Sequence, residues 1–484
     1  MSEISTLKPQ EVFKYFDQIL QIPRPSKKEG KIRKFLIDFA KEHNLQYSVD
    51  DTGNVLIYKP ATKGKENAPT VILQSHMDMV PEKRTDLEHN FETDPIEAYI
   101  DGNWIRTKGT TLGADDGIGI AATLAVLASD SLEHPPIEAL FTVDEETGMT
   151  GAFGIKPNFL KGEILINLDS EDEGELFIGS AGGMDTVAIF EYKPENTRQD
   201  FISYEVSIDK LHGGHSGDEI DKGYANAIKL LTRFLYNLHN QIYFQLNFFE
   251  GGKLRNAIPK DAKAYISFKP ENQDTVKALH SKFAEIFRQE YGKTDPEQVF
   301  SIKKIEFQEK AIDNTIKEKL LLSLYACPHG VYAWSKDMEG LVETSTNLAT
   351  VKMLENNKIE VATSQRSSVD TAKEDIATMV ASVFKLAGAD VSHSDGYPGW
   401  KPNPESKILK ITVEAYKRLF GKEPVVRAIH AGLECGMFLE KYPHLDMISF
   451  GPTIKGAHTP EERLDIASTQ KFWDLLVEVL KNIN

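Results

Sequence analysis

Two amphipathic helices are predicted near the start of the chain. Apolar residues recur three or four positions apart between Lys8 and Asn44, and the pattern is broken at Pro23 and Pro25. Apolar residues at this spacing form one face of a helix, and a proline inside such a pattern ends it. The segment therefore predicts one helix before the two prolines and a second helix after them.

A different pattern follows, in which short apolar runs alternate with helical stretches. Residues 70–75, 137–143 and 163–168 are apolar runs of strand length, and the alanine-rich stretch 120–129 before the second run has the character of a helix. Buried strands of a parallel sheet read as short apolar runs of this kind. Strands that alternate with helices predict an α/β domain with a largely parallel sheet.

The pattern changes again after Gly182 and Gly183. Residues 186–192 and 202–208 alternate apolar and polar side chains, as strands with one covered face do. Helical patterns recur in the segments 219–239, 273–290 and 370–387. Together these elements predict a second, two-layer α+β domain with helices on one face of its sheet.

The α/β pattern returns near the C-terminus. Residues 393–404 are dense in glycine and proline, which is typical of a linker, and a strand at 447–450 and a final helix from Ser468 come after them. We therefore expect the second domain to be an insertion. The predicted architecture is a mostly parallel-sheet α/β domain in two sequence pieces, 1–184 and 390–484, interrupted by a two-layer α+β domain at 185–389.

Composition narrows the range of partners. The chain has 484 residues, of which 40% are hydrophobic and 27% charged, as in ordinary globular proteins of two domains. Its net charge of −17 argues against a nucleic acid or an anionic membrane surface as the partner. Two distant cysteines cannot build a disulfide framework, and no apolar segment reads as a signal peptide or a membrane span. We therefore expect a cytoplasmic protein.

Acidic and imidazole side chains follow each of the three early strands. The segments concerned are 75–78 (Ser-His-Met-Asp), 144–146 (Asp-Glu-Glu) and 169–171 (Asp-Ser-Glu). Asp115 and Asp116 precede the helix at 120–129, and His458 follows the last strand. The carboxyl ends of parallel strands share one edge of a sheet, where α/β proteins place their sites. We therefore expect these side chains to meet at that edge.

Gathered at one edge, these groups predict a metal centre. They comprise two imidazoles and several carboxylates, with no lysine or arginine among them. Carboxylates packed together repel one another unless protons or cations neutralise them. A mixed set of His and carboxylate ligands suits zinc, with manganese or cobalt as alternatives, and two ions bridged by one carboxylate would absorb most of the charge. Such a pair, about 3.5–4 Å apart, activates a bridging water, so hydrolysis is the natural reaction class.

A competing pattern overlaps this site. Residues 117–122 match the G-x-G-x-x-A pattern of dinucleotide-binding proteins, which would make the chain a dehydrogenase. The residues before the pattern do not form a strand, and Asp115 and Asp116 would face a pyrophosphate with like charge. We interpret the glycines instead as allowing the loop and the helix to pack closely around Asp115. Taken singly, a His or an acidic pair after a strand is more often a loop residue or a helix cap, so the metal centre rests on their joint placement.

The chain as a whole resembles the co-catalytic dizinc peptidase family that includes aminoacylases, carboxypeptidases and dipeptidases. Six motifs carry the resemblance, in the family's order and across nearly the whole chain: SHMDMV (75–80), LGADDGIG (112–119), VDEETGMTGA (143–152), INLDSE (166–171), HGGHSG (212–217) and GAHTPEE (456–462). The segments TLGADDGIGIAA, LDSEDEGE and IHAGLECG favour the dipeptidase branch. An aspartate at position 169 also resembles the aminopeptidase and dipeptidase branches, since many other members have glutamate there.

The resemblance implies a role for seven residues of the predicted catalytic domain. His76 and Asp169 would hold one metal ion, Glu146 and His458 the other, and Asp115 would bridge the two. Glu145 matches the general base that takes a proton from the attacking water and delivers it to the leaving amine. Asp78 matches the carboxylate that orients His76, and two residues spaced i and i+2 in an extended segment do point to the same side.

The resemblance also implies that the inserted domain is a lid with substrate contacts. His215 resembles a histidine that stabilises the tetrahedral oxyanion. Asn256 and Arg366 resemble residues that recognise the substrate's C-terminal carboxylate, a task for which the arginine fork is suited. Gly432 resembles a backbone contact from the catalytic domain. A homodimer formed through the lid domain is a further implication.

The expected function is therefore metal-dependent hydrolysis of the peptide bond of unblocked dipeptides, Xaa-His dipeptides included, with Glu145 as general base. Small peptides would be the substrates, and neither nucleic acid nor a membrane would be a partner. Two alternatives stay open. The first is a carboxypeptidase or N-acyl-amino-acid deacylase of the same family. The second is a non-catalytic relative that binds metal or peptide, although Glu145 and Asp78, which such a relative would be expected to lose, are both present.

Overall fold

The chain divides into two compact units in the computed structural model, which describes residues 2–484. The first unit comprises the described residues up to Gly179 together with Pro402–Ala428 and Leu433–Asn484. The second comprises Ser180–Lys401 and Ile429–Gly432. The expected boundaries, after residues 184 and 389, differ from these. Gly432, which we expected to contribute from the catalytic domain, is grouped with the second unit.

Hydrogen bonds explain these boundaries. Residues 397–400, expected to be a linker, pair with residues 180–183 through antiparallel bridges between Ser180 and Trp400 and between Gly183 and Tyr397. The Ala181 N–H donates to the carbonyl oxygens of residues 429 and 431, at 3.1 and 3.0 Å. A glycine- and proline-rich composition does not reveal such pairing. The expected first boundary, after residue 184, therefore falls later in the chain than the observed one, and the expected second boundary, after residue 389, falls earlier.

The first unit is built on an eight-stranded sheet with the order β1-β2-β6-β3-β7-β21-β8-β20. Its strands are β1 (Gln46–Val49), β2 (Val55–Lys59), β3 (Val71–His76), β6 (Ile137–Thr142), β7 (Ile164–Asn167), β8 (Glu175–Ser180), β20 (Val425–Ile429) and β21 (Asp446–Ser449). The central strands β6, β3, β7 and β21 run parallel, while β1, β2 and β8 pair antiparallel beside them. Every residue of β3, β6 and β7 is buried, which confirms the three apolar runs as core strands.

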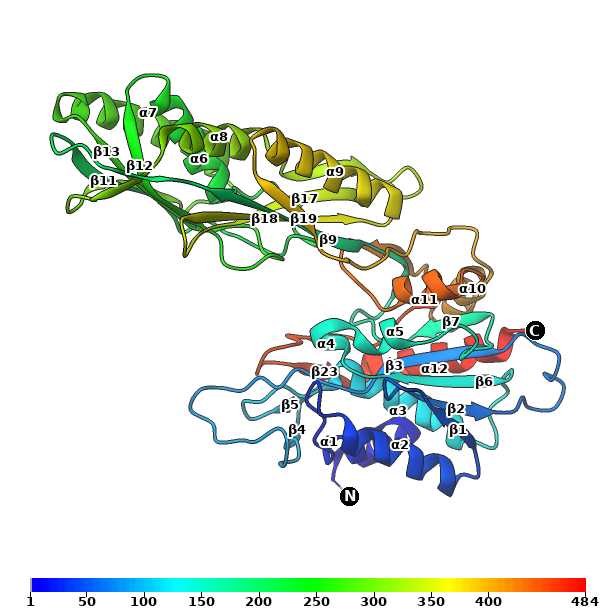
Figure 1. Cartoon of the computed structure of the whole chain (residues 1–484). Coiled ribbons are helices and arrows are strands. Elements are labelled where there is room, and N and C mark those ends of the chain that lie inside the picture. Colours follow the sequence, from blue (N-terminus) through cyan, green and yellow to red (C-terminus); the bar gives the residue numbers. More distant parts are fainter. Residues whose placement is uncertain (1) are drawn as a thin grey trace. The chain divides into compact units, whose positions relative to one another are not determined.

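Helices and a small second sheet complete this unit. Its helical elements are η1 (Ile4–Thr6), α1 (Gln10–Leu20), α2 (Gly30–Glu42), α3 (Ala114–Ala128), α4 (Glu145–Gly148), α5 (Thr150–Gly154), α10 (Lys407–Phe420), α11 (Cys435–Lys441) and α12 (Ile466–Asn482). Helices α1 and α2 are the pair predicted on either side of the prolines, and both lie on one side of the sheet, with α10 and α11 on the other (Figure 1). The small sheet, which the sequence did not predict, contains β4 (Ala98–Asp101), β5 (Trp104–Thr107), β22 (Ile454–Lys455) and β23 (Arg463–Asp465).

The second unit is a two-layer α+β structure, as the alternating strands predict. Its large antiparallel sheet contains β9 (Gly182–Glu191), β11 (Ile202–Asp209), β12 (Phe244–Gly251), β13 (Ala262–Phe268), β14 (Val299–Lys304), β16 (Gly330–Trp334), β17 (Val342–Leu354), β18 (Lys358–Ser367) and β19 (Asp390–His393). A separate pair is formed by β10 (Pro194–Asn196) and β15 (Lys310–Ile312).

Helices cover one face of the large sheet (Figure 1). They are α6 (Ala227–His239), α7 (Gln273–Tyr291), α8 (Asn314–Ala326) and α9 (Asp370–Leu386), and the short 3-10 helix η2 (Pro270–Asn272) precedes α7. Their buried aromatic residues, among them Phe234, Phe283 and Phe384, pack on the sheet and form the core of this unit. The sequence pattern did not predict α8. It also predicted that α6 begins at residue 219, whereas residues 219–226 form turns and loop. No helix within residues 2–484 is long and apolar enough to cross a membrane.

Candidate dimetal site

The parallel strands of the first unit bring four chain segments to one edge of the sheet. His76 ends β3 directly opposite Thr142, which ends β6. Glu145 and Glu146 begin α4 just after β6, and Asp169 comes two residues after the end of β7. Asp115 lies in the first turn of α3. The expectation that the strand ends converge is therefore confirmed by the geometry.

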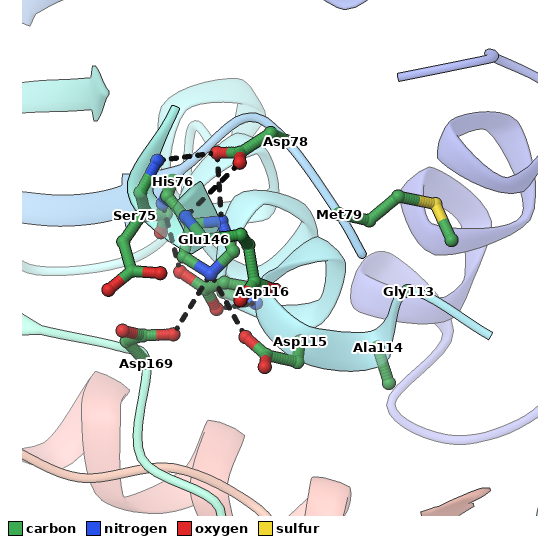
Figure 2. A network of polar contacts seen from close by, with 12 residues as sticks. Ser75, His76, Asp78, Met79, Gly113, Ala114, Asp115, Asp116, Glu146 and Asp169 are labelled. Atoms are coloured by element: carbon green, nitrogen blue, oxygen red, sulfur yellow. Dashed lines mark hydrogen bonds and ion pairs between the residues drawn. The ribbon is translucent and has the colours of Figure 1, made fainter. Parts of the chain in front are cut away.

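One group of ligand atoms surrounds the Nε2 atom of His76 (Figure 2). This atom lies 2.9 Å from Oδ1 of Asp115 and 3.2 Å from Oδ1 of Asp169, and all three side chains are nearly buried. If Nε2 of His76 carries a proton, its single N–H cannot point at both carboxylate oxygens. If Nε2 carries no proton, its lone pair faces two negatively charged carboxylates, which is unfavourable. A cation fits this arrangement, because the ligands of a tetrahedral zinc ion lie about 3.3 Å from one another.

A second group surrounds the Nε2 atom of His458. It lies 3.0 Å from Oδ2 of Asp115 and 2.9 Å from Oε2 of Glu146. The two oxygens of Asp115 therefore face two different imidazoles. Each group offers one imidazole nitrogen and two carboxylate oxygens, and they share Asp115, so the donor atoms fit a pair of divalent ions with a bridging carboxylate.

The neighbouring Asp116 has different partners. Its Oδ2 accepts a hydrogen bond from the His76 backbone N–H at 3.2 Å, and its Oδ1 accepts one from the Gly119 N–H, also at 3.2 Å. The peptide bond between Asp115 and Asp116 is cis. A Cβ atom on Gly119 would collide with the Asp116 carboxylate, 2.2 Å from its Oδ1. The glycine thus allows the helix to pack against this acidic pair. His76, Asp116 and Asp169 also each offer a ligand atom within 4.8 Å of the other two, so the choice of Asp115 over Asp116 as a ligand stays a prediction.

Asp78 contacts two of the converging segments. Its Oδ1 lies 3.4 Å from Nδ1 of His76, on the side of the ring opposite Asp115 (Figure 2). The same carboxylate accepts hydrogen bonds from the backbone N–H groups of Glu145 at 3.0 Å and Glu146 at 3.3 Å. Burial favours the neutral carboxyl, but the hydrogen bond and charge of His76 lower the pKa of Asp78 to about 2. Asp78 is therefore a charged group that lies beside the imidazole and holds the start of α4.

Glu145 lies beside the first group of ligand atoms. His76, Glu145 and Glu146 each offer an atom within 4.8 Å of the other two. Burial and the nearby charges of Asp169 and Glu434 raise the pKa of Glu145 well above its ordinary value, although His76 opposes this. A carboxylate with a raised pKa is a stronger base than a free one, which suits proton transfer near neutral pH.

The pKa values of Asp169 and His458 show that the charged groups of the site interact strongly. Burial and the charges of Asp115 and Glu146 raise the pKa of Asp169 to about 7, despite the opposing effect of His76. The hydrogen bonds that His458 donates to the carboxylates of Asp115 and Glu146 raise its pKa to about 11. In the absence of metal, protons on Asp169 and His458 therefore offset part of the negative charge. Divalent ions would replace these protons at the same donor atoms.

The four residues predicted to contact substrate lie in the second unit. Arg366 is in β18 and is buried, with 7% of its surface exposed. Its Nη1 donates to the Tyr397 hydroxyl at 3.0 Å, and its buried Nε has no partner among the described residues. His215 forms a β-bridge with Ala257, the residue after Asn256. Gly432 ends the short segment that is grouped with this unit.

Several buried charged residues near the candidate dimetal site were not predicted, among them Arg24, Glu462 and Glu434. Arg24 donates to the backbone carbonyls of Met77, Asp78 and Gly113, which lie within two residues of His76 or Asp115 in the sequence. Glu462 accepts from backbone amides at the start of α3. The Oε2 of Glu434 accepts from Gln74 at 2.6 Å and from Thr142 at 2.8 Å. Glu462 and Glu434 do lie in the quoted motifs GAHTPEE and IHAGLECG, which was a usable signal. Nothing in the sequence around Arg24 points to the site.

Comparisons with known proteins agree with this geometry. The chain matches the model of "Peptidase family M20/M25/M40" over residues 72–482. It is 43% identical over 483 residues to the cytosol non-specific dipeptidase of Escherichia coli (strain K12), covering 100% of this chain and 99% of that protein.

Two solved structures share the fold. The aminoacylhistidine dipeptidase from Vibrio alginolyticus is similar with a TM-score of 0.93 and 44% identity, covering 100% of this chain and 98% of that one. The aminopeptidase PepT from Bacillus cereus is similar in fold alone, with a TM-score of 0.58 and 16% identity over 99% of each chain. On its match to the family model and its full-length similarity to these relatives, this chain belongs to peptidase family M20/M25/M40.

Proposed function

We propose that this protein is a metal-dependent dipeptidase that hydrolyses the peptide bond of unblocked dipeptides, Xaa-His dipeptides among them. The observation that carries the proposal is Asp115, whose two oxygens each face a different imidazole, in a site surrounded by further carboxylates. Full-length similarity to a cytosol non-specific dipeptidase and to an aminoacylhistidine dipeptidase supports the substrate class.

Five residues would hold the metal ions. His76, Asp115 and Asp169 would bind one ion, and Asp115, Glu146 and His458 the other. Zinc suits these borderline and hard donors, with manganese or cobalt as alternatives. When bound, the ions supply a Lewis acid for the scissile carbonyl and lower the pKa of a water molecule. Asp78 would keep the His76 ring in place through Nδ1 and fix the tautomer that ligates through Nε2.

Glu145 would move the proton. Its carboxylate would take a proton from the attacking water and later hand it to the leaving amine. Two observations support this role: its position beside His76 and Glu146, and its raised pKa. Asp78 would position Glu145 indirectly, because the Asp78 carboxylate accepts a hydrogen bond from the Glu145 backbone N–H.

Residues of the second unit would select the substrate. We propose that Arg366 and Asn256 bind the C-terminal carboxylate, that His215 stabilises the tetrahedral oxyanion, and that Gly432 offers a backbone contact. The buried, unpaired Nε of Arg366 supports this assignment, since a buried donor without a partner costs free energy unless a ligand satisfies it. A clamp on the free carboxylate, with a free amine at the other end, would limit substrates to dipeptides.

Location and assembly complete the proposal. We propose a cytoplasmic protein, on the strength of the cytosolic relative from Escherichia coli. We also propose a homodimer formed through the second unit, on the strength of the family resemblance. Light scattering of the purified protein tests the dimer, since a monomer at micromolar concentration would contradict it.

A substrate panel tests the proposed activity. The metal-loaded protein would be given Ala-His, N-acetyl-Ala-His and Ala-His amide, and the release of amino acid would be measured. We expect cleavage of Ala-His and much slower cleavage of both blocked forms. Faster release of histidine from N-acetyl-Ala-His than from Ala-His would overturn the proposal in favour of a carboxypeptidase, and release of acetate from it would favour a deacylase. The absence of cleavage of any peptide would favour a non-catalytic relative.

A further inference from the structure

The backbone of Gly113 lies between two buried charged side chains. Its N–H donates to Oε2 of Glu462 at 2.9 Å, and its carbonyl oxygen accepts from Nη2 of Arg24. Arg24 and Glu462 are each only 2% exposed. Gly113 comes two residues before Asp115, so both charged groups act on the loop that carries the proposed bridging ligand.

Arg24 connects this loop to the segment after β3. Its Nη1 donates to the carbonyl oxygens of Met77 at 3.0 Å and Asp78 at 2.5 Å, directly after His76. The backbone of Arg24 is fixed to the same segment, because its carbonyl accepts from the Met79 N–H at 3.1 Å. One guanidinium therefore links the segment of His76 and Asp78 to the loop of Asp115.

Glu462 connects the Asp115 loop to the segment that carries His458. Besides Gly113, its carboxylate accepts hydrogen bonds from the backbone N–H groups of Leu112 at 2.7 Å, Ala114 at 2.8 Å and Asp115 at 3.3 Å. These are the free amides at the start of α3, where a carboxylate is favoured. Since Glu462 follows His458 by four residues, it holds the segments of both proposed ligands together.

Two glycines make room for the guanidinium. A Cβ atom on Gly113 would lie 2.8 Å from Arg24 Nη2, and one on Gly117 would lie 2.6 Å from the same atom. Gly113 also has a φ of +68°, which side chains with a Cβ rarely adopt. The glycines of LGADDGIG thus have a physical reason that the dinucleotide pattern does not supply.

We propose that Arg24 and Glu462 are positioning residues of the dimetal centre. They fix the three segments that carry His76, Asp115 and His458 at ligand spacing before metal binds, so that binding does not have to order the loops. Both act through backbone groups, and within residues 2–484 neither forms a hydrogen bond or ion pair with a proposed ligand side chain. The proposal rests on the proposed function, because only a metal-binding site requires this spacing.

Matched variants separate positioning from general stability. The test variants are Arg24→Met and Glu462→Gln. Lys59→Met is the control for Arg24, because Lys59 donates to three carbonyls, including those of Val126 and Leu127, at the opposite end of α3. Glu138→Gln is the control for Glu462, because buried Glu138 accepts from the backbone N–H groups of Lys161 and Gly162 away from the site.

Metal binding is the deciding measurement. Each protein is stripped of metal, its unfolding temperature is recorded, and zinc chloride is titrated against a chromophoric chelator. The visible spectrum with cobalt chloride reports ligand geometry independently of activity. We expect at least about 10-fold weaker binding of one or both ions in the Arg24 and Glu462 variants, the loss typical of an outer-shell partner. The controls are expected to unfold at lower temperature and to keep wild-type affinity.

The outcomes are distinguishable. Wild-type zinc affinity and cobalt spectra in the Arg24 and Glu462 variants would overturn the positioning role. So would equal losses of affinity in the test and control variants, since stability alone would then explain them. If Glu462→Gln does not fold, Glu462→Asp, which keeps the charge but shortens the reach, replaces it with the same expectation. If the wild type itself binds no pair of ions, the proposed function fails instead.

Discussion

Oδ2 of Asp115 lies 3.0 Å from Nε2 of His458, although the two residues are 343 positions apart in the sequence. The other oxygen of Asp115 lies 2.9 Å from Nε2 of His76. One carboxylate therefore joins the first third of the chain to its C-terminal segment, and the proposed reaction depends on this shared position.

Replacing the shared carboxylate should damage both metal sites. Asp115→Asn keeps the size of the side chain but removes its charge and one oxygen. We expect zinc affinity to fall by more than the roughly 10- to 100-fold that loss of an outer-shell partner costs. Metal analysis and dipeptide turnover check this. Asp172→Asn is the control, since Asp172 is a half-exposed partner of Lys455, and its metal content should not change.

Glu145→Gln should separate proton transfer from metal binding. The amide cannot accept the proton from water, so we expect kcat to fall by about 10²- to 10⁴-fold, the usual contribution of a general base. Zinc content should stay at the wild-type value, because Glu145 is not among the proposed ligands. Exposed Glu461, replaced by Gln, is the control. Full activity of Glu145→Gln would disprove the assigned base.

The stability of the metal-free protein should fall as pH rises. Burial raises the folded-state pKa of Glu434 from 4.5 to about 8, although its hydrogen bond from Thr142 and the charge of His76 oppose this. A raised folded-state pKa contributes stability that is fully present below about pH 4.5 and is lost as pH rises through about 8. Glu434→Gln, which resembles the protonated form, should weaken this dependence between pH 5 and 8.5. Thermal unfolding of both proteins in a chelator measures it, and identical pH profiles would contradict the prediction.

Metal binding should release protons. In the metal-free protein, hydrogen bonds to Asp115 and Glu146 raise the pKa of His458 to about 11, so this imidazole is charged at pH 7.5. A metal ion binds only the neutral ring, and the proton must leave. Calorimetry of zinc binding in two buffers of different ionisation enthalpy counts the protons. We expect a net release of protons on zinc binding, and a smaller release in His458→Gln. Equal heats of binding in the two buffers would contradict proton release.

Arg366→Met should affect substrates that end in a free carboxylate. A hydrogen bond to a charged group contributes about 1.5–3 kcal/mol, so kcat/KM for Ala-His should fall roughly 10- to 100-fold. Dipeptide amides, which carry no charge at that end, should lose little. A mutation that only unfolds the second unit would reduce both equally, and Arg255→Met serves as the control because Arg255 forms a half-exposed ion pair with Asp185.

Much of this site could be predicted because its side chains follow strand ends. Short apolar runs located β3, β6 and β7, and the parallel arrangement then brought His76, Glu146 and Asp169 together. The choice of Asp115 over Asp116 came from the resemblance and stays a prediction, since Asp116 also lies within 4.8 Å of ligand atoms of His76 and Asp169.

The missed features depend on contacts between distant segments. Arg24 lies between two helices in sequence, and only folding brings its guanidinium to the carbonyls behind His76. The pairing of residues 180–183 with 397–400 is likewise long-range, so the Gly- and Pro-rich stretch read as a linker. Helix α8 was missed because no apolar stripe at helical spacing was recognised in residues 314–326, although Leu320 and Leu324 are buried.

The central claim is that two metal ions, held through Asp115, are required for peptide hydrolysis. The most direct measurement is a zinc titration of the stripped protein while the hydrolysis of Ala-His is followed. The account predicts no activity in chelator and a rise that reaches its plateau at two ions per chain. Hydrolysis at the full rate before any metal is added, or a plateau at one ion per chain, would contradict it.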